Sequence, residues 1–218
     1  MRINVDNFQI ERFISRLISV LFHPMFLTLY GVFLLYQLDL YNYFPHEFHK
    51  WVSSELEKWT YMVVAINTIL IPSSLIPFYL YRKFILSLRM EQPRERIIPL
   101  IIQSILFFIT YYILHRFYAP VLIVNAILVG SLSVFIALLI TWYWKISLHL
   151  LGIGALTGIF FMLSVKYRID INNYLVFLLI ASGLVGYSRL KLEAHNPKQI
   201  YAGFALGFCI SLGVLYFF

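Results

Sequence analysis

The chain has 218 residues, of which 61% are hydrophobic and only 12% are charged. A soluble domain carries about 25% charged residues, so half that density cannot cover a surface that faces water. This composition excludes a soluble globular protein, a disordered chain and a coiled coil, and it indicates a polytopic membrane protein. Because the basic residues lie between apolar runs, the net charge of +7 indicates anionic headgroups and anionic substrates as partners, not nucleic acid.

The N-terminal segment, residues 1–16, mixes charged and apolar side chains. We therefore predict an amphipathic lead-in at the membrane interface over 1–16, with no cleavable signal peptide. Residues 17–218 show no internal repeat and no long linker. They are predicted to form a single transmembrane domain.

Apolar stretches long enough to cross a bilayer recur along the rest of the chain. A hydrocarbon core of about 30 Å is crossed by roughly 20 apolar residues in a helix, and backbone groups in lipid must be hydrogen-bonded within their own segment. The fold prediction is all-α: a polytopic transmembrane helical bundle with six to seven spans, kinked at Pro24, Pro72 and Pro77. The stretches are 17–37, 60–82, 97–115, 119–141, 148–165, 173–188 (which is short) and 200–218.

The longest polar segment between spans is 39–59, which interleaves acids, lysines and histidines with aromatic residues. Tyrosine and tryptophan favour the headgroup region of a bilayer. We therefore predict an interfacial helix in this loop, with Tyr41, Tyr43, Trp51 and Trp59 in the aromatic belt.

Three polar clusters interrupt the apolar pattern, and such groups at membrane depth are costly and usually functional. They are Arg89–Arg96 before the third stretch, Lys145–His149 at the start of the fifth, and Ser188–Gln199 between the sixth and seventh. Two spans separate each cluster from the next, so all three return to the same face. Their arginines and two histidines predict an anion site there.

The third cluster carries the most specific pattern. Ser188 and Arg189 are followed after five residues by His195 and after three more by Gln199. This spacing resembles the third signature of the type 2 phosphatidic acid phosphatase superfamily, SRxxxxxHxxxD, in the form of a divergent bacterial-type member.

The other two clusters resemble the remaining signatures in the same order. Ile146–His149 is similar to PSGH, and Arg89, six residues, Arg96 and Ile97 are similar to KxxxxxxRP. The resemblance covers about residues 85–210, which we treat as a phosphatase-like core, and the first 80 residues match no signature.

The resemblance implies a role for each matching residue. His195 would be the nucleophile that forms a phosphohistidine, and His149 the acid and base. Gln199 takes the place of the Asp that orients the nucleophile. Neither a metal nor a cofactor is implied. The phosphate-binding residues would be Arg89, Arg96, Ser147 and Arg189, with Lys145 either touching phosphate or extending to the interface.

Departures from the family pattern include Arg89, Ile97, Leu148 and Gln199, which stand where the signatures have Lys, Pro, Gly and Asp. Gln199 can accept a hydrogen bond from a ring N–H, but it offers no negative charge. Glu91 or Glu193 is an alternative source of that charge.

The leading hypothesis is an integral-membrane, metal-independent phosphoric monoester or diphosphate hydrolase that acts on a lipid phosphate or a polyprenyl or other lipid diphosphate. The alternative is a catalytically degenerate lipid-phosphate binding or transport protein of the same fold. An unrelated small transporter would show broken helices or inverted repeats, and neither is expected here. His23 is interpreted as a buried, hydrogen-bonded histidine and His115 as interfacial, and haem is not expected.

The resemblance also implies a multi-pass protein of the bacterial inner membrane. Twelve of the 17 Lys and Arg residues fall on the face that holds the N-terminus and the three clusters, and five fall on the other. The positive-inside rule places the first face in the cytoplasm. Without the four basic candidates Arg89, Arg96, Lys145 and Arg189 the bias falls to eight against five, so the face of the site and the oligomeric state stay open.

Overall fold

A computed structural model describes residues 5–38 and 54–217, and within these ranges every regular element is a helix. Six helices are long and apolar enough to cross a membrane, and a bent pair makes a seventh span if it is counted as one. This confirms the prediction of an all-α polytopic bundle with six to seven spans. The protein is an integral membrane protein.

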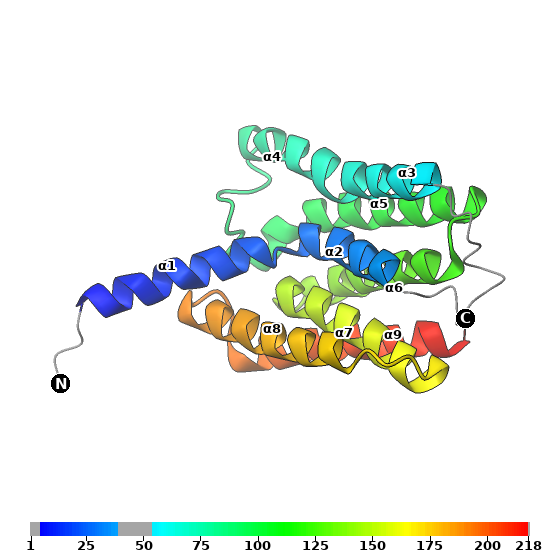
Figure 1. The fold of residues 1–218 in the computed structure, drawn as a ribbon. Helices are drawn as coiled ribbons and strands as arrows, with labels where there is room; N and C mark the ends of the chain where they lie inside the picture. Colours follow the sequence, from blue (N-terminus) through cyan, green and yellow to red (C-terminus); the bar gives the residue numbers. More distant parts are fainter. Residues whose placement is uncertain (1–4, 39–53, 218) are drawn as a thin grey trace.

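The helices follow one another along the chain with short connections where the chain is described (Figure 1). They are α1 (Val5–Leu21), α2 (Pro24–Gln37), α3 (Ser54–Ala65), the π-helical turn η2 (Ile66–Leu70), α4 (Ile71–Tyr81), the 3-10 turn η3 (Pro93–Arg96), α5 (Ile97–Arg116), α6 (Val121–Thr141), α7 (Leu148–Tyr167), α8 (Asn172–Lys191) and α9 (Pro197–Phe217).

The first predicted span differs from the structure. Helix α1 takes in most of the predicted lead-in and runs on to Leu21, and the axis then turns by 58° before α2. Proline disfavours a helical residue before it and is well suited to the first turn of a helix. His23 accordingly has extended backbone angles, and its Nδ1 accepts a hydrogen bond from the Met25 N–H at 3.4 Å. The expected kink at Pro24 is therefore a broken helix, which the sequence did not predict.

The second span, Ser54–Tyr81, absorbs its prolines without breaking. Pro72 has no N–H to donate, and the preceding turn widens so that the Ile71 N–H reaches the Ile66 carbonyl. Trp59 lies in α3 with its ring centroid 4.8 Å from that of Phe117. The predicted interfacial helix, with Tyr41, Tyr43 and Trp51, lies outside the described residues.

Helix α7 is the centre of the bundle and packs most extensively against α9. Glycines allow the two backbones to approach: a Cβ on Gly154 would lie 2.3 Å from the Phe204 carbonyl oxygen, and one on Gly207 would lie 2.1 Å from the Leu151 carbonyl oxygen. No other residue fits such a contact. This pair holds the second and third clusters at a fixed separation.

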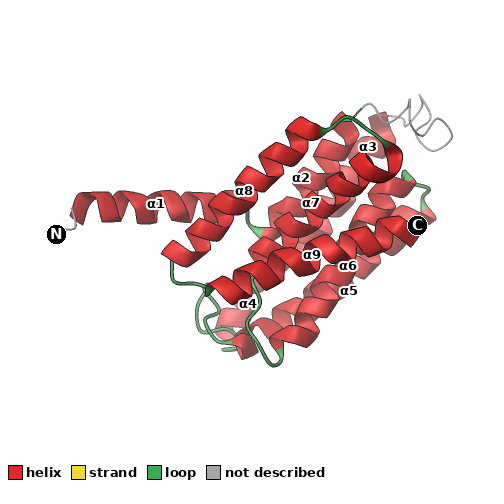
Figure 2. Ribbon diagram, turned by 90° about the horizontal axis from the view of Figure 1, so that it is seen from below, coloured by secondary structure: helices red, strands yellow, loops and turns green. Residues whose placement is uncertain are grey.

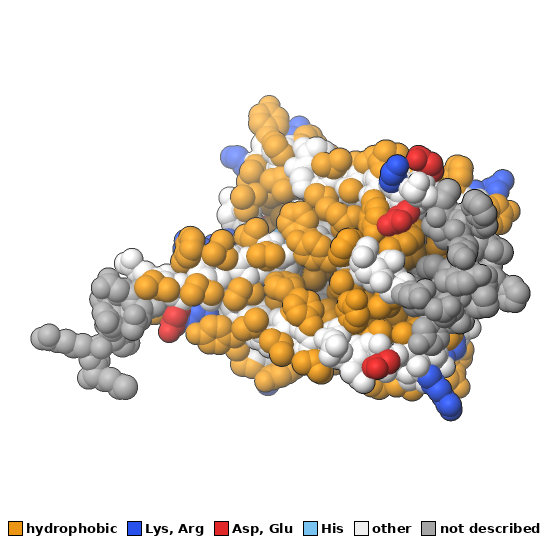
Figure 3. Space-filling model, in the orientation of Figure 1, with side chains coloured by type: hydrophobic (Ala, Val, Ile, Leu, Met, Phe, Trp, Pro, Cys, Tyr) orange, Lys and Arg blue, Asp and Glu red, His pale blue; other side chains and the backbone are white. Residues whose placement is uncertain are grey.

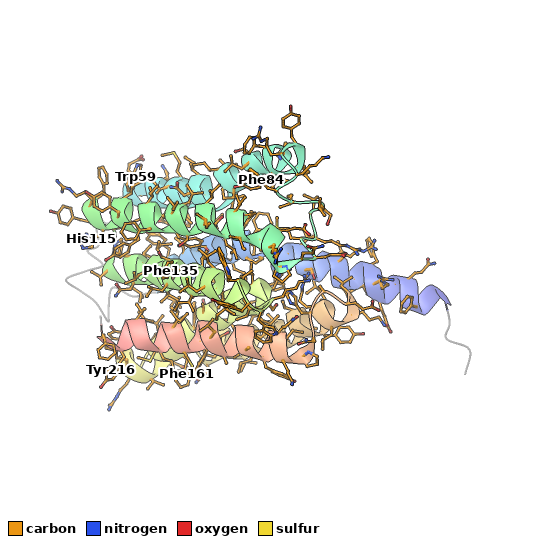
Figure 4. All side chains as sticks on the ribbon, turned by 180° about the vertical axis from the view of Figure 1, so that it is seen from behind. Trp59, Phe84, His115, Phe135, Phe161 and Tyr216 are labelled. Carbon is orange, nitrogen blue, oxygen red and sulfur yellow. The ribbon has the colours of Figure 1, made fainter. Side chains whose placement is uncertain are left out.

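The outside of the bundle suits a bilayer. Apolar side chains cover the flank in Figure 3, and charged side chains gather toward its two ends. In Figure 4, Trp59, His115 and Tyr216 lie toward one end of the bundle and Phe84 toward the other. Phe135 and Phe161 have 48% and 38% of their surface exposed, as expected for side chains that contact lipid.

The opposite end of the bundle holds α1 and the connections between α4 and α5, α6 and α7, and α8 and α9 (Figures 1 and 2). Helix α1 projects beyond the other helices at this end and packs against α8. The three predicted clusters all belong to this end.

Candidate active site

A cavity of about 1040 Å³ opens at this end and brings the three clusters together. Its lining contains most of the predicted site residues; Ser147 and Gln199 lie outside the lining. The predicted residues that line it are Arg89, Arg96, Lys145, His149, Arg189 and His195.

His195 lies in the connection between α8 and α9 and is 8% exposed. Its Nδ1 is 3.0 Å from Oε1 of Gln199, the residue that stands where the family pattern has Asp. Gln199 is the third residue of α9, so the start of that helix fixes the histidine ring.

The same Gln199 oxygen closes the start of α9. It accepts the Asn196 backbone N–H at 3.2 Å, while Asn196 Oδ1 accepts the Gln199 backbone N–H at 3.0 Å. This reciprocal pair is a capping box. Since the amide atom between Asn196 and His195 must be the oxygen, Nδ1 of His195 is the donor, and the neutral ring keeps its lone pair on Nε2.

Cations surround His195 on the cavity side. The pKa of His195 is lowered to about 3, first by burial and then by the positive charges of Arg96 and Arg189, against the opposing effect of the Gln199 hydrogen bond. The pKa of Lys145 is also lowered, by burial and then by the same two arginines. His195 is therefore a neutral imidazole in a positively charged pocket.

Arg96 is buried in this pocket and Arg189 is half-buried in it. Arg96 donates from Nε to the Met90 carbonyl at 3.0 Å and from a terminal nitrogen to the Ile146 carbonyl at 3.4 Å, which ties the first cluster to the second. Glu95 is occupied by the backbone N–H groups of Leu86 and Gln92 and makes no ion pair with Arg96 among the described residues. Their charge is thus left for an anion.

Arg89 and Ser147 stand apart from this group. The Arg89 side chain is 66% exposed and lies 3.9 Å from Glu91, so it belongs to the rim of the cavity. Ser147 is fully buried behind the lining, with an Oγ that has no hydrogen-bond partner. Its backbone N–H donates to the Gln199 carbonyl at 3.3 Å and thereby joins the second cluster to the third.

His149 begins the first turn of α7 and is 9% exposed. Its Nε2 lies 3.1 Å from the Ser19 carbonyl, which can only accept, so Nε2 carries the proton and Nδ1 of the neutral ring has the lone pair. The His23 ring meets it edge-on, with centroids 5.3 Å apart. The break between α1 and α2 therefore supports the second histidine.

Part of the chain that forms this cavity resembles a known protein family. Residues 142–218 match the family model described as the PAP2 superfamily. This match supports the predicted resemblance to the type 2 phosphatidic acid phosphatase superfamily over these residues. No curated protein and no solved structure matches the chain. The PAP2 superfamily is generally one of phosphatases, so the match suggests phosphatase activity on phosphate esters.

The superfamily match covers α7 to α9, with the second and third clusters, and ends short of α1 to α6. Among the cavity-lining residues outside it are four polar residues at helical spacing along α1 and its break: Arg12, Arg16, Ser19 and His23. Nε of Arg12 and Oγ of Ser19 have no hydrogen-bond partner. The spacing of polar residues 12, 16, 19 and 23 within an apolar stretch is the signal that sequence reasoning missed. His23 is hydrogen-bonded, as interpreted, but it is half-buried in the cavity wall and not buried.

Neither candidate for the missing carboxylate contacts the nucleophile position. Glu91 and Glu193 line the cavity, but Nδ1 of His195 is bonded to Gln199. Within residues 5–38 and 54–217, no three His, Cys, Asp or Glu side chains form a group that could hold a metal. Six Lys and Arg side chains and these two acids line the cavity, which leaves an excess of positive charge.

Proposed function

We propose that this protein is a metal-independent phosphatase that hydrolyses a lipid phosphate, or a polyprenyl or other lipid diphosphate, through a phosphohistidine on His195. The observation that carries the proposal is His195 itself. It presents a neutral Nε2, oriented by Gln199, to a cavity that also holds Arg96, Arg189 and Lys145.

In the first step, Nε2 of His195 attacks phosphorus while the bond from phosphorus to the ester or bridging oxygen breaks. The lipid alcohol, or lipid monophosphate in the case of a diphosphate, leaves with a proton from Nδ1 of His149, which the neutral ring first takes from the bound phosphate monoanion. The guanidinium groups of Arg96 and Arg189 balance the negative charge on the phosphoryl oxygens in the transition state.

In the second step, water attacks the phosphohistidine and the nitrogen–phosphorus bond breaks. Nδ1 of His149 takes the proton from the water, since its Nε2–H is held by the Ser19 carbonyl. Inorganic phosphate leaves, and both histidines return to their starting states. The site opens at the bundle end where a lipid headgroup lies, so the tail of the substrate can stay in an apolar environment.

The direct test replaces His195 with Ala and measures phosphate release from lipid phosphates in detergent. We expect loss of turnover and of any acid-labile phosphoryl label on the protein. The matched control is His115→Ala, which removes a histidine from the far end of the bundle (Figure 4). Equal phosphate release by wild type and His195→Ala would show that the assignment is wrong.

A second candidate function is lipid-phosphate binding without hydrolysis. Two departures favour it: Gln199 cannot carry the negative charge that stabilises a positively charged histidine, and Leu148 adds bulk to the cavity lining. The Gln199→Asp variant distinguishes the two functions. A slow hydrolase should speed up when the carboxylate is restored, whereas a binding protein should gain little.

A further inference from the structure

The cavity does not end at the polar site. It continues between α2, α5, α6 and α7, and each helix lines it with one stripe of residues at helical spacing. On α2 the stripe is Pro24, Leu27, Thr28, Gly31, Val32 and Leu35. This spacing keeps one face of a helix along the whole passage. We call this continuation the shaft.

The lining of the shaft has the same length along three of the helices. The lining runs from Pro24 to Leu35 on α2, from Arg96, just before α5, to Phe107 on α5, and from Leu148 to Ile159 on α7. Each range is twelve residues long, which is eleven helical steps. At 1.5 Å per residue this is about 16 Å. One leaflet of the hydrocarbon core is about 15 Å deep, so the shaft matches the length of chain that one leaflet encloses.

Glycines keep the shaft open. A Cβ on Gly130 would lie 2.6 Å from the Phe107 ring, and one on Gly152 would lie 2.9 Å from Leu27 Cδ1. Phe107 and Leu27 therefore fit against bare backbone, and any larger residue at these glycines would displace them. Protein interiors are normally close-packed, so a passage preserved in this way calls for an occupant.

We infer that the shaft binds the hydrocarbon chain of the substrate, with the phosphate at His195 and a single acyl or isoprenoid chain running down inside the bundle beside α2. This inference rests on the proposed function, because its polar end is the proposed catalytic site. The shaft is a single passage and holds a single hydrocarbon chain. A second chain of the same lipid would lie outside the bundle. The lining beyond Arg96 is mainly apolar, so it offers a hydrocarbon chain surroundings as apolar as the lipid tails of the bilayer.

Two polar atoms in the shaft wall bear on the kind of chain. Nε2 of Gln103 and Oγ of Ser133 are buried there with no hydrogen-bond partner. Gln103 follows Arg96 by seven residues, which is about 10 Å along α5. An unpaired amide beside hydrocarbon is costly, so an oxygen acceptor at this depth, such as the ester carbonyl of an acyl chain, is favoured over a purely hydrocarbon chain.

The test compares butyl phosphate with hexadecyl phosphate, which share the head chemistry and differ in the chain. Wild type should have a much higher kcat/KM for hexadecyl phosphate. Gly31→Leu adds bulk to the shaft lining, where a Cβ on Gly31 would lie 3.1 Å from Leu156 Cδ1. The variant should lower kcat/KM for hexadecyl phosphate by about tenfold or more, as each 1.4 kcal/mol of lost binding does, and it should leave turnover of butyl phosphate unchanged. The matched control is Gly183→Leu, because a Cβ on Gly183 meets nothing within 4 Å.

Ala126→Phe, near the far end of the shaft, is a second variant in case Gly31→Leu does not fold; butyl phosphate turnover reports folding in both. Equal activity of wild type on the two chain lengths, or equal loss on both substrates in a variant that keeps the wild-type melting temperature, would overturn the inference. The rise in melting temperature on adding hexadecyl phosphate measures chain binding without hydrolysis. A protein that is stabilised but releases no phosphate would contradict the proposed function and leave the inference about the shaft standing.

A last arm compares an oleoyl glycerol phosphate with farnesyl phosphate in the Gln103→Leu variant. A selective loss for the oleoyl lipid supports an ester carbonyl beside Gln103, and equal effects on the two lipids contradict that placement. Both outcomes are compatible with a chain in the shaft. Equal kcat/KM values of wild type for both lipids and for butyl phosphate would contradict the inference.

Discussion

Two regions of the molecule line the same cavity in different ways. Helices α7 to α9 hold His149, Arg189 and His195 on a frame of glycine contacts and backbone hydrogen bonds. Helices α1 and α2 supply Arg12, Arg16 and His23 from a helix that is broken at Pro24 and projects beyond the bundle. The first region matches the superfamily and the second does not.

We infer from this difference that α7 to α9 carry the catalytic groups and that α1 and α2 attract the substrate. Atoms that exchange bonds with phosphorus must be placed to within a fraction of an ångström, and only the region α7 to α9 has the close backbone contacts that do so. A surface that attracts an anionic headgroup needs charge more than exact placement, because electrostatic attraction acts over several ångströms. We therefore expect substitutions in the two regions to change different kinetic parameters.

The largest expected effect lies in the superfamily region. Arg189→Gln removes a half-buried guanidinium beside His195 and should lower kcat by about 100-fold, as loss of one donor to a developing negative charge does. KM should change little. The measurement is turnover of butyl phosphate by wild type and variant, with Arg89→Gln at the exposed rim as a comparison that should lose much less. Equal losses at the two arginines would contradict the assignment of Arg189 to the pocket.

The next effect lies in α1. The double variant Arg12→Gln, Arg16→Gln should lower kcat/KM by about tenfold at low salt, with kcat nearly unchanged, because these arginines attract the substrate and do not contact the reacting bond. The loss should shrink as salt is added. Arg82→Gln is the matched control: Arg82 is an exposed arginine at the same end of the bundle that does not line the cavity. A fall in kcat as large as that of Arg189→Gln would remove the distinction between the two regions.

The same comparison explains how far the sequence could predict the structure. Hydropathy was enough for the all-α bundle because a helix in lipid must be apolar over roughly 20 residues whatever its neighbours. The common face of the three clusters followed from counting spans. The signature spacing also identified His195 and Gln199, because both lie within one connection and one helix start, where local sequence sets local geometry.

The rest depends on contacts between distant segments. Nothing near Pro24 in sequence indicates that the Ser19 carbonyl would hold His149, which is 130 residues away. The stripe of Arg12, Arg16 and His23 is visible in the sequence, but its role appears only once α1 lies over the cavity. The shaft is formed by four helices at once, so no single segment predicts it.

The smallest expected effect concerns pH, and it tests whether the pocket around His195 is as positive as the structure indicates. The ordinary pKa of a histidine is 6.5, and in this site the pKa of His195 is about 3. The attacking form is the neutral ring, which dominates above the pKa. Protonation of His195 should therefore cause no loss of activity between about pH 5 and pH 8, and the loss should come only as pH falls toward about 3.

The direction of the pKa shift of His195 can be tested by removing a neighbouring positive charge. Arg96→Gln takes away a positive charge that disfavours protonated His195, so the pKa of His195 should rise and the acid limb of the pH profile should move to higher pH. Ionisation of the substrate is the same for both proteins, so the difference between their profiles isolates the enzyme. Arg82→Gln should leave the limb in place. If Arg96→Gln lowers activity but leaves the limb unmoved, Arg96 acts on the substrate without acting on His195, and the two arginines do not form one electrostatic unit with the nucleophile.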